Sequence, residues 1–358
     1  MISLKKNKST KHLPITMFKA ENYPLTELNA FRFKHSVKHY VECQTHSELT
    51  EYVNNTSDKY AGSAPIVFGE GSNTVLTNDI NGSVLRYTGK TVTVDSQADD
   101  RSVQVTAQAG KNWHELVVEM TAKGFQGIEN LSLIPGTCGA APVQNIGAYG
   151  VELSDILISV TALHWPSRTI KVLKKDECQF GYRDSIFKQH PDTFIITEIT
   201  LRLNTENKLV ISYAALKDEL QKRQIQSPTS RDISEIVCDI RRSKLPDPLL
   251  IPNAGSYFKN PVVSKKTHQQ IVKKYSNVPS FPAGPDAIKI AAGWLIESSG
   301  LKGYRHASGH VGVHKNQALV LVHDGNGKAS DLLDLAEHVQ TTIINNFGIE
   351  LEREPVLR

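Results

Sequence analysis

The fold is decided by Ile134-Pro135-Gly136-Thr137-Cys138-Gly139-Ala140-Ala141-Pro142-Val143-Gln144-Asn145-Ile146-Gly147-Ala148-Tyr149-Gly150. This stretch is dense in glycine, alanine and proline and has no charged residue. A solvated linker would be rich in Ser, Lys and Glu, and a core helix does not tolerate so many glycines. Glycine lets backbone N–H groups approach a ligand, and consecutive N–H groups form anion-binding concavities. The stretch predicts a pyrophosphate cradle, with a tightly packed structural turn as the alternative.

A second glycine loop lies upstream, at Gly69-Glu70-Gly71-Ser72-Asn73. Residues 64–67 are apolar and strand-like, and the apolar residues 75 and 76 follow the loop. A Rossmann unit needs a helix directly after its glycines, whereas residues 77–82 are typical of a turn. Two glycine loops that each follow a strand, neither in a Rossmann or P-loop frame, indicate a different nucleotide-binding fold.

Length and composition predict a soluble, cytoplasmic protein of two or three domains, because the 358 residues are 39% hydrophobic and 22% charged. No apolar run approaches the ~18 residues of a transmembrane helix, so we expect no membrane association. Residues 4–11 are basic and predict a solvated tail, with a nucleic-acid arm as the alternative; at a net charge of +4 we expect no nucleic-acid partner. The four scattered cysteines fit reduced, buried thiols.

The pattern of apolar residues predicts an α+β protein. A helix over residues 112–123 would be capped by Asn112 and would bury Trp113 and Leu116. Two prolines after residue 243 end another helix and mark a domain boundary. The expected strands span residues 31–42, 84–87, 91–95, 102–108, 151–165, 169–173 and 194–203, and the other helices span 47–54, 233–242, 269–275, 291–298 and 330–346.

Three further segments carry candidate chemistry. Ser256 follows small residues and could donate a proton in a site that stabilises its alkoxide. The alternative is a buried serine that is hydrogen-bonded to the backbone. Arg183 suits oxyanion stabilisation, or a surface pair with Asp184. Glu352 and Glu354 offer a catalytic acid of raised pKa, or an exposed charged terminus.

His306, His310 and His314 recur every four residues, a spacing that would align them on a helix. Glycines interrupt the segment, and no carboxylate completes a zinc motif. A ligand-lining loop is the alternative interpretation, and we predict no metal.

Together these pieces resemble the UDP-N-acetylenolpyruvoylglucosamine reductase family, in its tyrosine-loop subgroup. The resemblance runs from about Tyr23 to the C-terminus. The segments that carry it, in order, are Gly69-Glu70-Gly71-Ser72-Asn73, Ile134-Pro135-Gly136, Gln144-Asn145-Ile146-Gly147-Ala148-Tyr149-Gly150, Gly181-Tyr182-Arg183-Asp184-Ser185, Lys244-Leu245-Pro246-Asp247-Pro248, Asn253-Ala254-Gly255-Ser256 and Ala292-Gly293-Trp294-Leu295-Ile296.

The resemblance implies a two-part FAD-binding domain of the vanillyl-alcohol-oxidase type and a separate α+β substrate domain. The implied divisions are a flexible basic tail (1–20), FAD subdomains (21–88 and 89–243), a substrate domain (244–348) and a C-terminal segment that returns to the active site (349–358). It further implies a monomer in which NADPH reduces non-covalent FAD. Hydride then passes from flavin N5 to the enolpyruvyl β-carbon of UDP-N-acetylglucosamine enolpyruvate, which gives UDP-N-acetylmuramate for peptidoglycan synthesis.

The same resemblance implies residue roles. Ser256 would protonate the α-carbon, and Arg183 and Glu354 would stabilise the enolate-like intermediate. Substrate would be held by Tyr182, Tyr213, Lys244, Asn260 and Gln317. The cofactor would be bound by Gly69, Gly71, Ser72, Asn73, Pro135, Gly136, Gly139, Asn145, Gly147, Ala148, Tyr149 and Gly150.

The chain departs from the family pattern in two places. Glu70 puts an anionic side chain beside a predicted pyrophosphate. The chain ends at Arg358, soon after Glu354, so Glu354 is expected to be less firmly held, with Glu352 as the weaker candidate. Two other functions remain open: an FAD-dependent oxidase of the same fold, for which Cys138 is the available tethering residue, and a non-catalytic flavin- or sugar-nucleotide-binding module.

Overall fold

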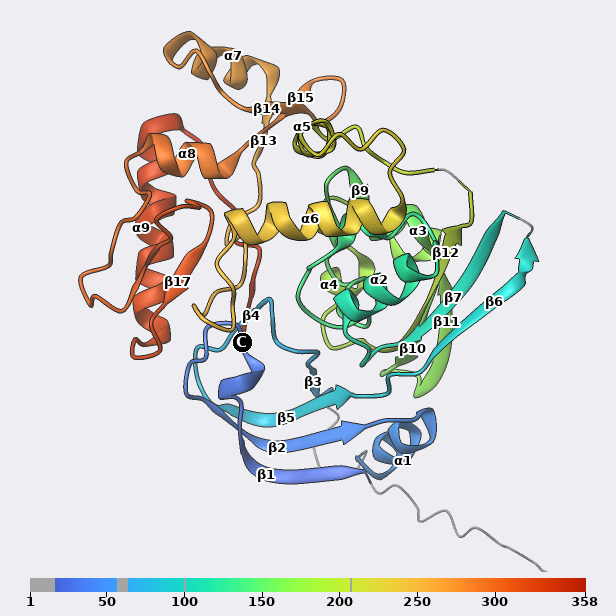
Figure 1. Ribbon diagram of the computed structural model, residues 1–358. Helices are drawn as coiled ribbons and strands as arrows, with labels where there is room; N and C mark the ends of the chain where they lie inside the picture. Colours follow the sequence, from blue (N-terminus) through green and yellow to red (C-terminus); the bar gives the residue numbers. More distant parts are fainter. Residues whose placement is uncertain (1–16, 57–63, 100, 207) are drawn as a thin grey trace, which may run out of the picture.

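The computed structural model describes residues 17–56, 64–99, 101–206 and 208–358 (Figure 1). Most of the expected tail, residues 1–16, lies outside this part. The tail was expected to run to residue 20, but strand β1 (Phe18–Pro24) already begins at Phe18 because it pairs antiparallel with β2 (Ser36–Cys43).

The first sheet has the strand order β1-β2-β5-β3 and lies at the bottom of Figure 1, next to α1 (His46–Thr56). Strand β5 (Ile80–Tyr87) pairs parallel with both β2 and β3 (Ile66–Val67). The strand predicted from residue 31 begins only at Ser36. Phe31 and Phe33 instead pack into the core of the C-terminal region, where their burial joins the two ends of the chain.

The second sheet is antiparallel, in the order β11-β10-β12-β7-β6. Helix α2 (Trp113–Ala122) has Asn112 as its N-cap, which accepts from the N–H of Glu115, and buries Trp113 and Leu116 as predicted. The strand predicted over residues 151–165 is interrupted by a turn of helix. The elements are β6 (Val92–Asp99), β7 (Ser102–Gln108), β8 (Gly147–Ala148), β9 (Val151–Glu152), α3 (Leu153–Ile156), β10 (Leu157–His164), β11 (Thr169–Lys174), α4 (Ile186–Gln189) and β12 (Phe194–Asn204).

Two helices follow the second sheet and bury their apolar faces against each other. They are α5 (Ala214–Lys222) and α6 (Ser230–Lys244), and α6 crosses the centre of Figure 1. The C-terminal region has a separate apolar core. Its elements are β13 (Val262–Ser264), α7 (Lys265–Lys274), β14 (Ser280–Pro282), β15 (Ala287–Ile290), α8 (Ala292–Ser298), β16 (Val311–Val313), β17 (Leu321–His323) and α9 (Ala329–Phe347).

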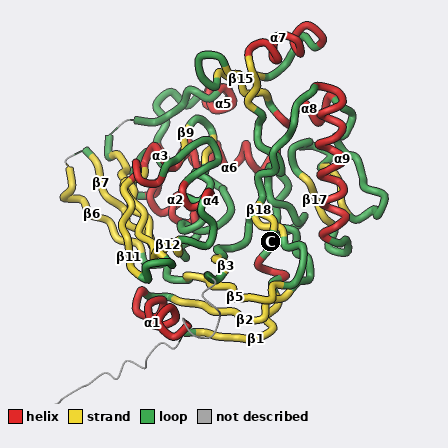
Figure 2. Tube along the Cα trace, turned by 180° about the vertical axis from the view of Figure 1, so that it is seen from behind, coloured by secondary structure: helices red, strands yellow, loops and turns green. Residues whose placement is uncertain are grey.

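The end of the chain returns to the first glycine loop (Figure 2). Strand β18 (Val356–Leu357) pairs parallel with β4 (Thr74–Val75), and the N–H of Thr77 donates to the carbonyl of Arg358 at 2.7 Å. The C-terminal segment therefore lies between the sheet that carries the first loop and the C-terminal core.

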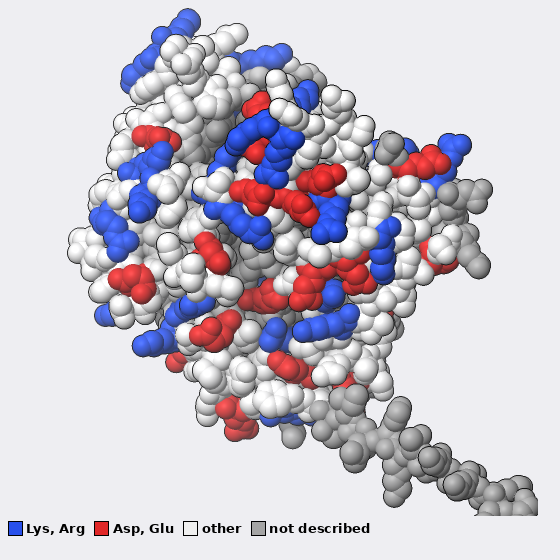
Figure 3. All heavy atoms as spheres, in the orientation of Figure 1, with Lys and Arg blue, Asp and Glu red and all other residues white. Residues whose placement is uncertain are grey.

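In the described part of the chain, no helix is both long and apolar enough to cross a membrane. On the face seen in Figure 3, basic and acidic side chains are interspersed, so this face has no extended field of a single sign.

Candidate active site

The two glycine loops lie against each other. Gly136 has a φ of +114°, and a Cβ added there would lie 2.9 Å from the Oγ of Ser72. A Cβ on Gly69 would lie 2.7 Å from the Oγ1 of Thr137, and the Ser72 hydroxyl donates to the carbonyl of Pro135 at 3.3 Å. Both positions exclude a side chain, so the glycines allow the loops to meet.

The facing loops present unpaired backbone donors. Among the hydrogen bonds of the described residues, none uses the N–H groups of residues 69–73 as donors, and the same holds for Gly136 and Thr137. A cluster of free N–H groups on glycine-containing turns binds anionic oxygens such as those of a diphosphate. This cluster fits the pyrophosphate cradle predicted from the sequence.

A cavity of about 380 Å³ opens beside the loops. Among the predicted cofactor residues, Gly69 and Gly139 line it, and the others are not part of its lining. Aromatic and aliphatic side chains line the rest of it, as suits a planar heterocycle. They are Phe68, Tyr87, Phe187, Phe194 and Ile196, and the charged residues at its edge include Lys188, Arg353 and Glu354.

Glu354, at the edge of this cavity, pairs with Arg183. The Nε of Arg183 lies 3.3 Å from Oε1 of Glu354, and both side chains are largely buried. The Nε is otherwise without a hydrogen-bond partner among the described residues, although the guanidinium also donates to the carbonyl of Gly147 at 2.8 Å. Burial raises the pKa of Glu354, while the charges of Arg183 and two lysines oppose that rise. The pair is therefore a buried acid beside a fixed cation.

Glu354 is firmly held, contrary to the expectation from the short C-terminal segment. Its N–H donates to the carbonyl of Tyr257 at 2.9 Å, and its carbonyl lies 3.4 Å from the donating amide of Asn73. Glu352, the weaker candidate, is 69% exposed and pairs with Lys259. The geometry thus favours Glu354 as the buried carboxyl group.

Ser256 directly precedes Tyr257 and so lies beside the backbone that holds Glu354. It is half-buried, and its hydroxyl makes no hydrogen bond to the described residues, which contradicts the alternative of a buried serine bonded to backbone. Gly255 before it has a φ of +69° and donates to the side chain of Asn253 at 2.8 Å. The turn presents the serine with its hydroxyl available.

Comparison with known proteins decides between the open functions. A UDP-N-acetylenolpyruvoylglucosamine reductase of Pseudomonas aeruginosa is 46% identical over 292 residues, which are 82% of this chain and 85% of that protein. The enzyme of the same name from Ralstonia nicotianae is 42% identical over 94% of this chain and 98% of that protein.

The chain belongs to the UDP-N-acetylenolpyruvoylglucosamine reductase family.

Two further matches agree with membership of the reductase family. Residues 37–172 match the FAD binding domain family, and residues 247–358 match the C-terminal domain of UDP-N-acetylenolpyruvoylglucosamine reductase. The crystal structure of UDP-N-acetylenolpyruvylglucosamine reductase from Thermus caldophilus superimposes with a TM-score of 0.64 at 23% identity, covering 96% of this chain and 98% of that one. The α+β fold with an FAD-binding domain, expected from the sequence, is thereby confirmed.

The departure of this reductase at Glu70 has a structural explanation. The side-chain amide of Asn112 donates to the Glu70 carboxylate at 3.1 Å. The charge is therefore held at the N-terminus of α2, where a helix dipole favours an anion. Asn112 thus serves both as the cap of α2 and as the partner of Glu70.

The residues predicted to hold substrate do not form one connected cluster in the described part of the chain. Tyr182 is hydrogen-bonded to Asn260. Burial raises the pKa of Tyr182, and this hydrogen bonding opposes the rise. Tyr213 packs edge-on against Tyr149, with ring centroids 5.2 Å apart. No hydrogen bond or ion pair joins Lys244 or Gln317 to the Arg183–Glu354 pair in the described part of the chain.

Asn145, predicted to bind the cofactor, uses its side chain within the protein. Its amide donates to Glu152 at 2.8 Å and to the carbonyl of Gly181 at 3.2 Å, and its oxygen accepts from the N–H of Ser154. Asn145 therefore ties the second glycine loop to the segment that carries Arg183.

The three histidines do not converge. His306 lies 3.0 Å from the hydroxyl of Ser308, and His310 lies 2.9 Å from the carboxylate of Asp324. Among the described residues, no group of three or more His, Cys, Asp or Glu is placed to hold a metal ion.

Sequence reasoning missed two polar residues that organise this site in the reductase. Asn130 is fully buried just before the second glycine loop, and Lys188 lies five residues after Arg183. The two polar residues between the apolar Ile128 and Leu131 could have indicated a buried, hydrogen-bonded side chain, because buried polar groups are nearly always hydrogen-bonded. Nothing in the sequence indicated that the Lys188 ammonium donates to the carbonyl oxygen of Arg183.

Proposed function

We propose that this protein reduces UDP-N-acetylglucosamine enolpyruvate to UDP-N-acetylmuramate with NADPH, through non-covalently bound FAD, in the synthesis of peptidoglycan precursors. The observation that carries the proposal is the buried Arg183–Glu354 pair at the edge of a cavity between two glycine loops. Its relatives of the same name, at 42% and 46% identity, support the activity. We also propose that the chain acts as a cytoplasmic monomer, with the divisions expected from the sequence except that the tail ends before Phe18.

The chain has residues that fit FAD. Free N–H groups of residues 69–73 and 136–137 suit its diphosphate, and the apolar cavity suits its ring system. Bound FAD, reduced by NADPH, supplies the hydride to the enolpyruvyl β-carbon. Of the predicted cofactor residues, we assign the backbone of Gly69, Gly71, Ser72, Asn73 and Gly136 to direct contact; the others position the loops.

Arg183 and Glu354 hold the carboxylate of the substrate. Hydride addition at the β-carbon moves negative charge onto that carboxylate, so donors aimed at it gain most in the transition state. Arg183 supplies a fixed cation, whose Nε faces Glu354 at 3.3 Å and has no other hydrogen-bond partner among the described residues. Glu354 helps only as a protonated donor, and its burial favours that form.

Ser256 delivers the proton that completes the reduction. Its Oγ–H bond breaks as a C–H bond forms at the α-carbon, and the serine recovers its proton from water. The hydroxyl of Ser256, next to the Tyr257 backbone that holds Glu354, supports this role. Substrate is held in place by Tyr182, Tyr213, Lys244, Asn260 and Gln317.

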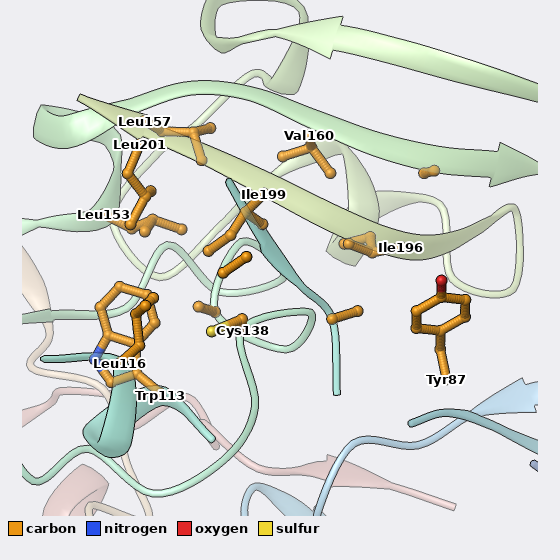
Figure 4. Close-up of a cluster of buried hydrophobic side chains, with 14 of the residues drawn as sticks. Tyr87, Trp113, Leu116, Cys138, Leu153, Leu157, Val160, Ile196, Ile199 and Leu201 are labelled. Carbon is orange, nitrogen blue, oxygen red and sulfur yellow. The ribbon is translucent and has the colours of Figure 1, made fainter. Parts of the chain in front are cut away.

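The oxidase alternative is not favoured. Cys138, its tethering residue, is fully buried among core side chains that include Trp113 and Leu116 (Figure 4). Burial raises the pKa of the Cys138 thiol and keeps it protonated. Cys138 does not line the cavity, although its neighbours Thr137 and Gly139 do.

An anaerobic flavin absorbance trace tests the function. NADPH should bleach the flavin, and UDP-N-acetylglucosamine enolpyruvate should restore its colour; recovery with oxygen alone would indicate an oxidase. In Ser256→Ala the bleaching should persist while substrate-dependent recovery slows by at least 100-fold, about the contribution of a general acid. Ser276→Ala, at an exposed serine, serves as the control. Unchanged recovery in Ser256→Ala would refute the proton-donor role.

A further inference from the structure

Lys188 reaches back to the backbone of the catalytic arginine. Its ammonium donates to the carbonyl oxygen of Arg183 at 3.0 Å. Arg183 has a φ of +55°, in the left-handed region that is strained for a residue with a Cβ. A bond from a cation to the carbonyl at this position stabilises the backbone conformation that sends the guanidinium towards Glu354.

The short helix α4 fixes the lysine in this position. Ser185 caps the helix by accepting from the N–H of Lys188, and its hydroxyl donates to the carbonyl of Val143 in the second glycine loop at 2.6 Å. The lysine therefore starts from a turn that is itself anchored to the predicted cofactor loop. Its side chain is half-buried and lines the cavity.

The charges around Lys188 belong to the catalytic centre. Glu354, Glu352, Asp184 and Lys259 all act on its ammonium. Glu354 in turn is surrounded by Arg183, Lys188, Lys259 and Glu352. Lys259 pairs with the exposed Glu352, and Arg183 is committed to the substrate carboxylate in the proposed mechanism. Lys188 has no such carboxylate pair among the described residues.

We propose that Lys188 is a positioning residue that locks Arg183 in its left-handed conformation and supplies the standing positive charge beside Glu354. The inference rests on the proposed function, because it assigns Arg183 to the substrate carboxylate. It extends that function by tying two catalytic residues to one side chain.

Binding of two nucleotide sugars to the oxidised holoenzyme tests this role without turnover. UDP-N-acetylmuramate carries the carboxylate that Arg183 would hold, and UDP-N-acetylglucosamine lacks it. The preference for the first ligand, measured as the ratio of the two Kd values by calorimetry, should fall about ten-fold or more in Lys188→Met. Lys188→Arg should keep most of the preference, and Lys171→Met, at an exposed lysine of β11, should keep all of it.

Two outcomes distinguish a failure of the role of Lys188 from a failure of the proposed function. If Lys188→Met keeps the full preference, the positioning role is wrong while the proposed function stands. If the unsubstituted protein has no preference, the carboxylate role of Arg183 is wrong and this inference falls with it. Should Lys188→Met not fold, Lys188→Gln, which keeps a donor without the charge, should lose part of the preference.

The pH profile of kcat provides a second readout that a purely structural role would not move. Removing the cation in Lys188→Met leaves Glu354 protonated to higher pH. The alkaline limb of the kcat profile should therefore move to higher pH, even though kcat itself falls. Lys188→Arg keeps the charge and should leave the limb in place. An unshifted limb in Lys188→Met would contradict the electrostatic part of the proposal.

Discussion

The side-chain amide of Asn130 donates to the carbonyl oxygen of Tyr149 at 2.8 Å. The same amide donates to the carbonyl of Val210, also at 2.8 Å. Val210 lies three residues before Tyr213, whose ring packs against that of Tyr149. One fully buried amide thus links the end of the second glycine loop to the segment that carries the substrate-side tyrosine.

Asn130→Ala should lower both stability and affinity for the UDP-sugar. Two partly buried carbonyls lose their donor, which costs about 1–3 kcal/mol in the free energy of unfolding. Urea denaturation measures this cost, and titration with UDP-N-acetylmuramate should show a weaker Kd. Asn130→Asp, which keeps the shape but places a carboxylate against two carbonyls, should be at least as destabilising. Equal stability of Asn130→Ala and the unsubstituted protein would contradict the linkage.

Gly136→Ala should weaken FAD binding. The added methyl meets the Oγ of Ser72 at 2.9 Å and the residue has a φ of +114°, so the Ser72 side chain must turn away or the facing loops must shift. Gly284→Ala is the matched control, because its φ is +124° but its Cβ position has no neighbour within 4 Å. Both variants lose stability from backbone strain, whereas only Gly136→Ala should raise the Kd for FAD, measured by quenching of flavin fluorescence. An equal loss of FAD affinity in both variants would show that backbone strain alone weakens FAD binding.

Asn112→Ala should destabilise the protein more than Glu70→Gln. Loss of a helix cap costs about 0.5–2 kcal/mol, and Asn112→Ala also frees the Glu70 carboxylate. Glu70→Gln keeps an acceptor for the Asn112 amide and should change the thermal midpoint little. Its Kd for FAD should also stay within about two-fold, because the carboxylate is turned away towards α2. A large gain in FAD affinity would mean that Glu70 does face the diphosphate.

Activity should fall as the pH rises through the pKa of Glu354. Burial raises that pKa, so the protonated, donating form persists above the ordinary range of a glutamate before it is lost. A kcat profile should therefore have an alkaline limb, and Glu354→Gln, which donates at every pH, should flatten it at a lower overall rate. A limb that survives unchanged in Glu354→Gln would assign it to another group.

Much of the architecture could be predicted because it is local in the sequence. Helix α2 with its Asn112 cap and strand β7 follow directly from spacing and capping chemistry. Strand β1 was missed because it depends on pairing with β2, and the turn of helix α3 inside a predicted strand depends on a capping box between Glu152 and Asp155. The partner of β1 is known only once the chain has folded, whereas the capping box of α3 is local and was an available signal in the sequence.

The candidate site likewise has parts that could be predicted from the sequence and parts that could not. The glycine loops and the residues Arg183, Ser256 and Glu354 could be identified from the sequence and from its family resemblance, but their distances could not. The roles of Lys188 and Asn130 depend on bonds to carbonyl oxygens, and a backbone acceptor leaves no mark in the residue that supplies it. For the same reason the sequence did not show that the Asn145 side-chain amide bonds Glu152, and the cofactor-binding role of Asn145 stays a prediction.

The pairing of β18 with β4 also sets an order of events during synthesis. Thr77 and Arg358 bond across 281 positions of sequence, so the first glycine loop leaves the ribosome long before its partner strand exists. Domains fold as they emerge, N-terminal parts first. A nascent chain can therefore form both flavin loops while it still lacks Glu354. In the proposed mechanism such a chain lacks the carboxyl group that acts with Arg183, and it remains catalytically silent until Glu354 has been added.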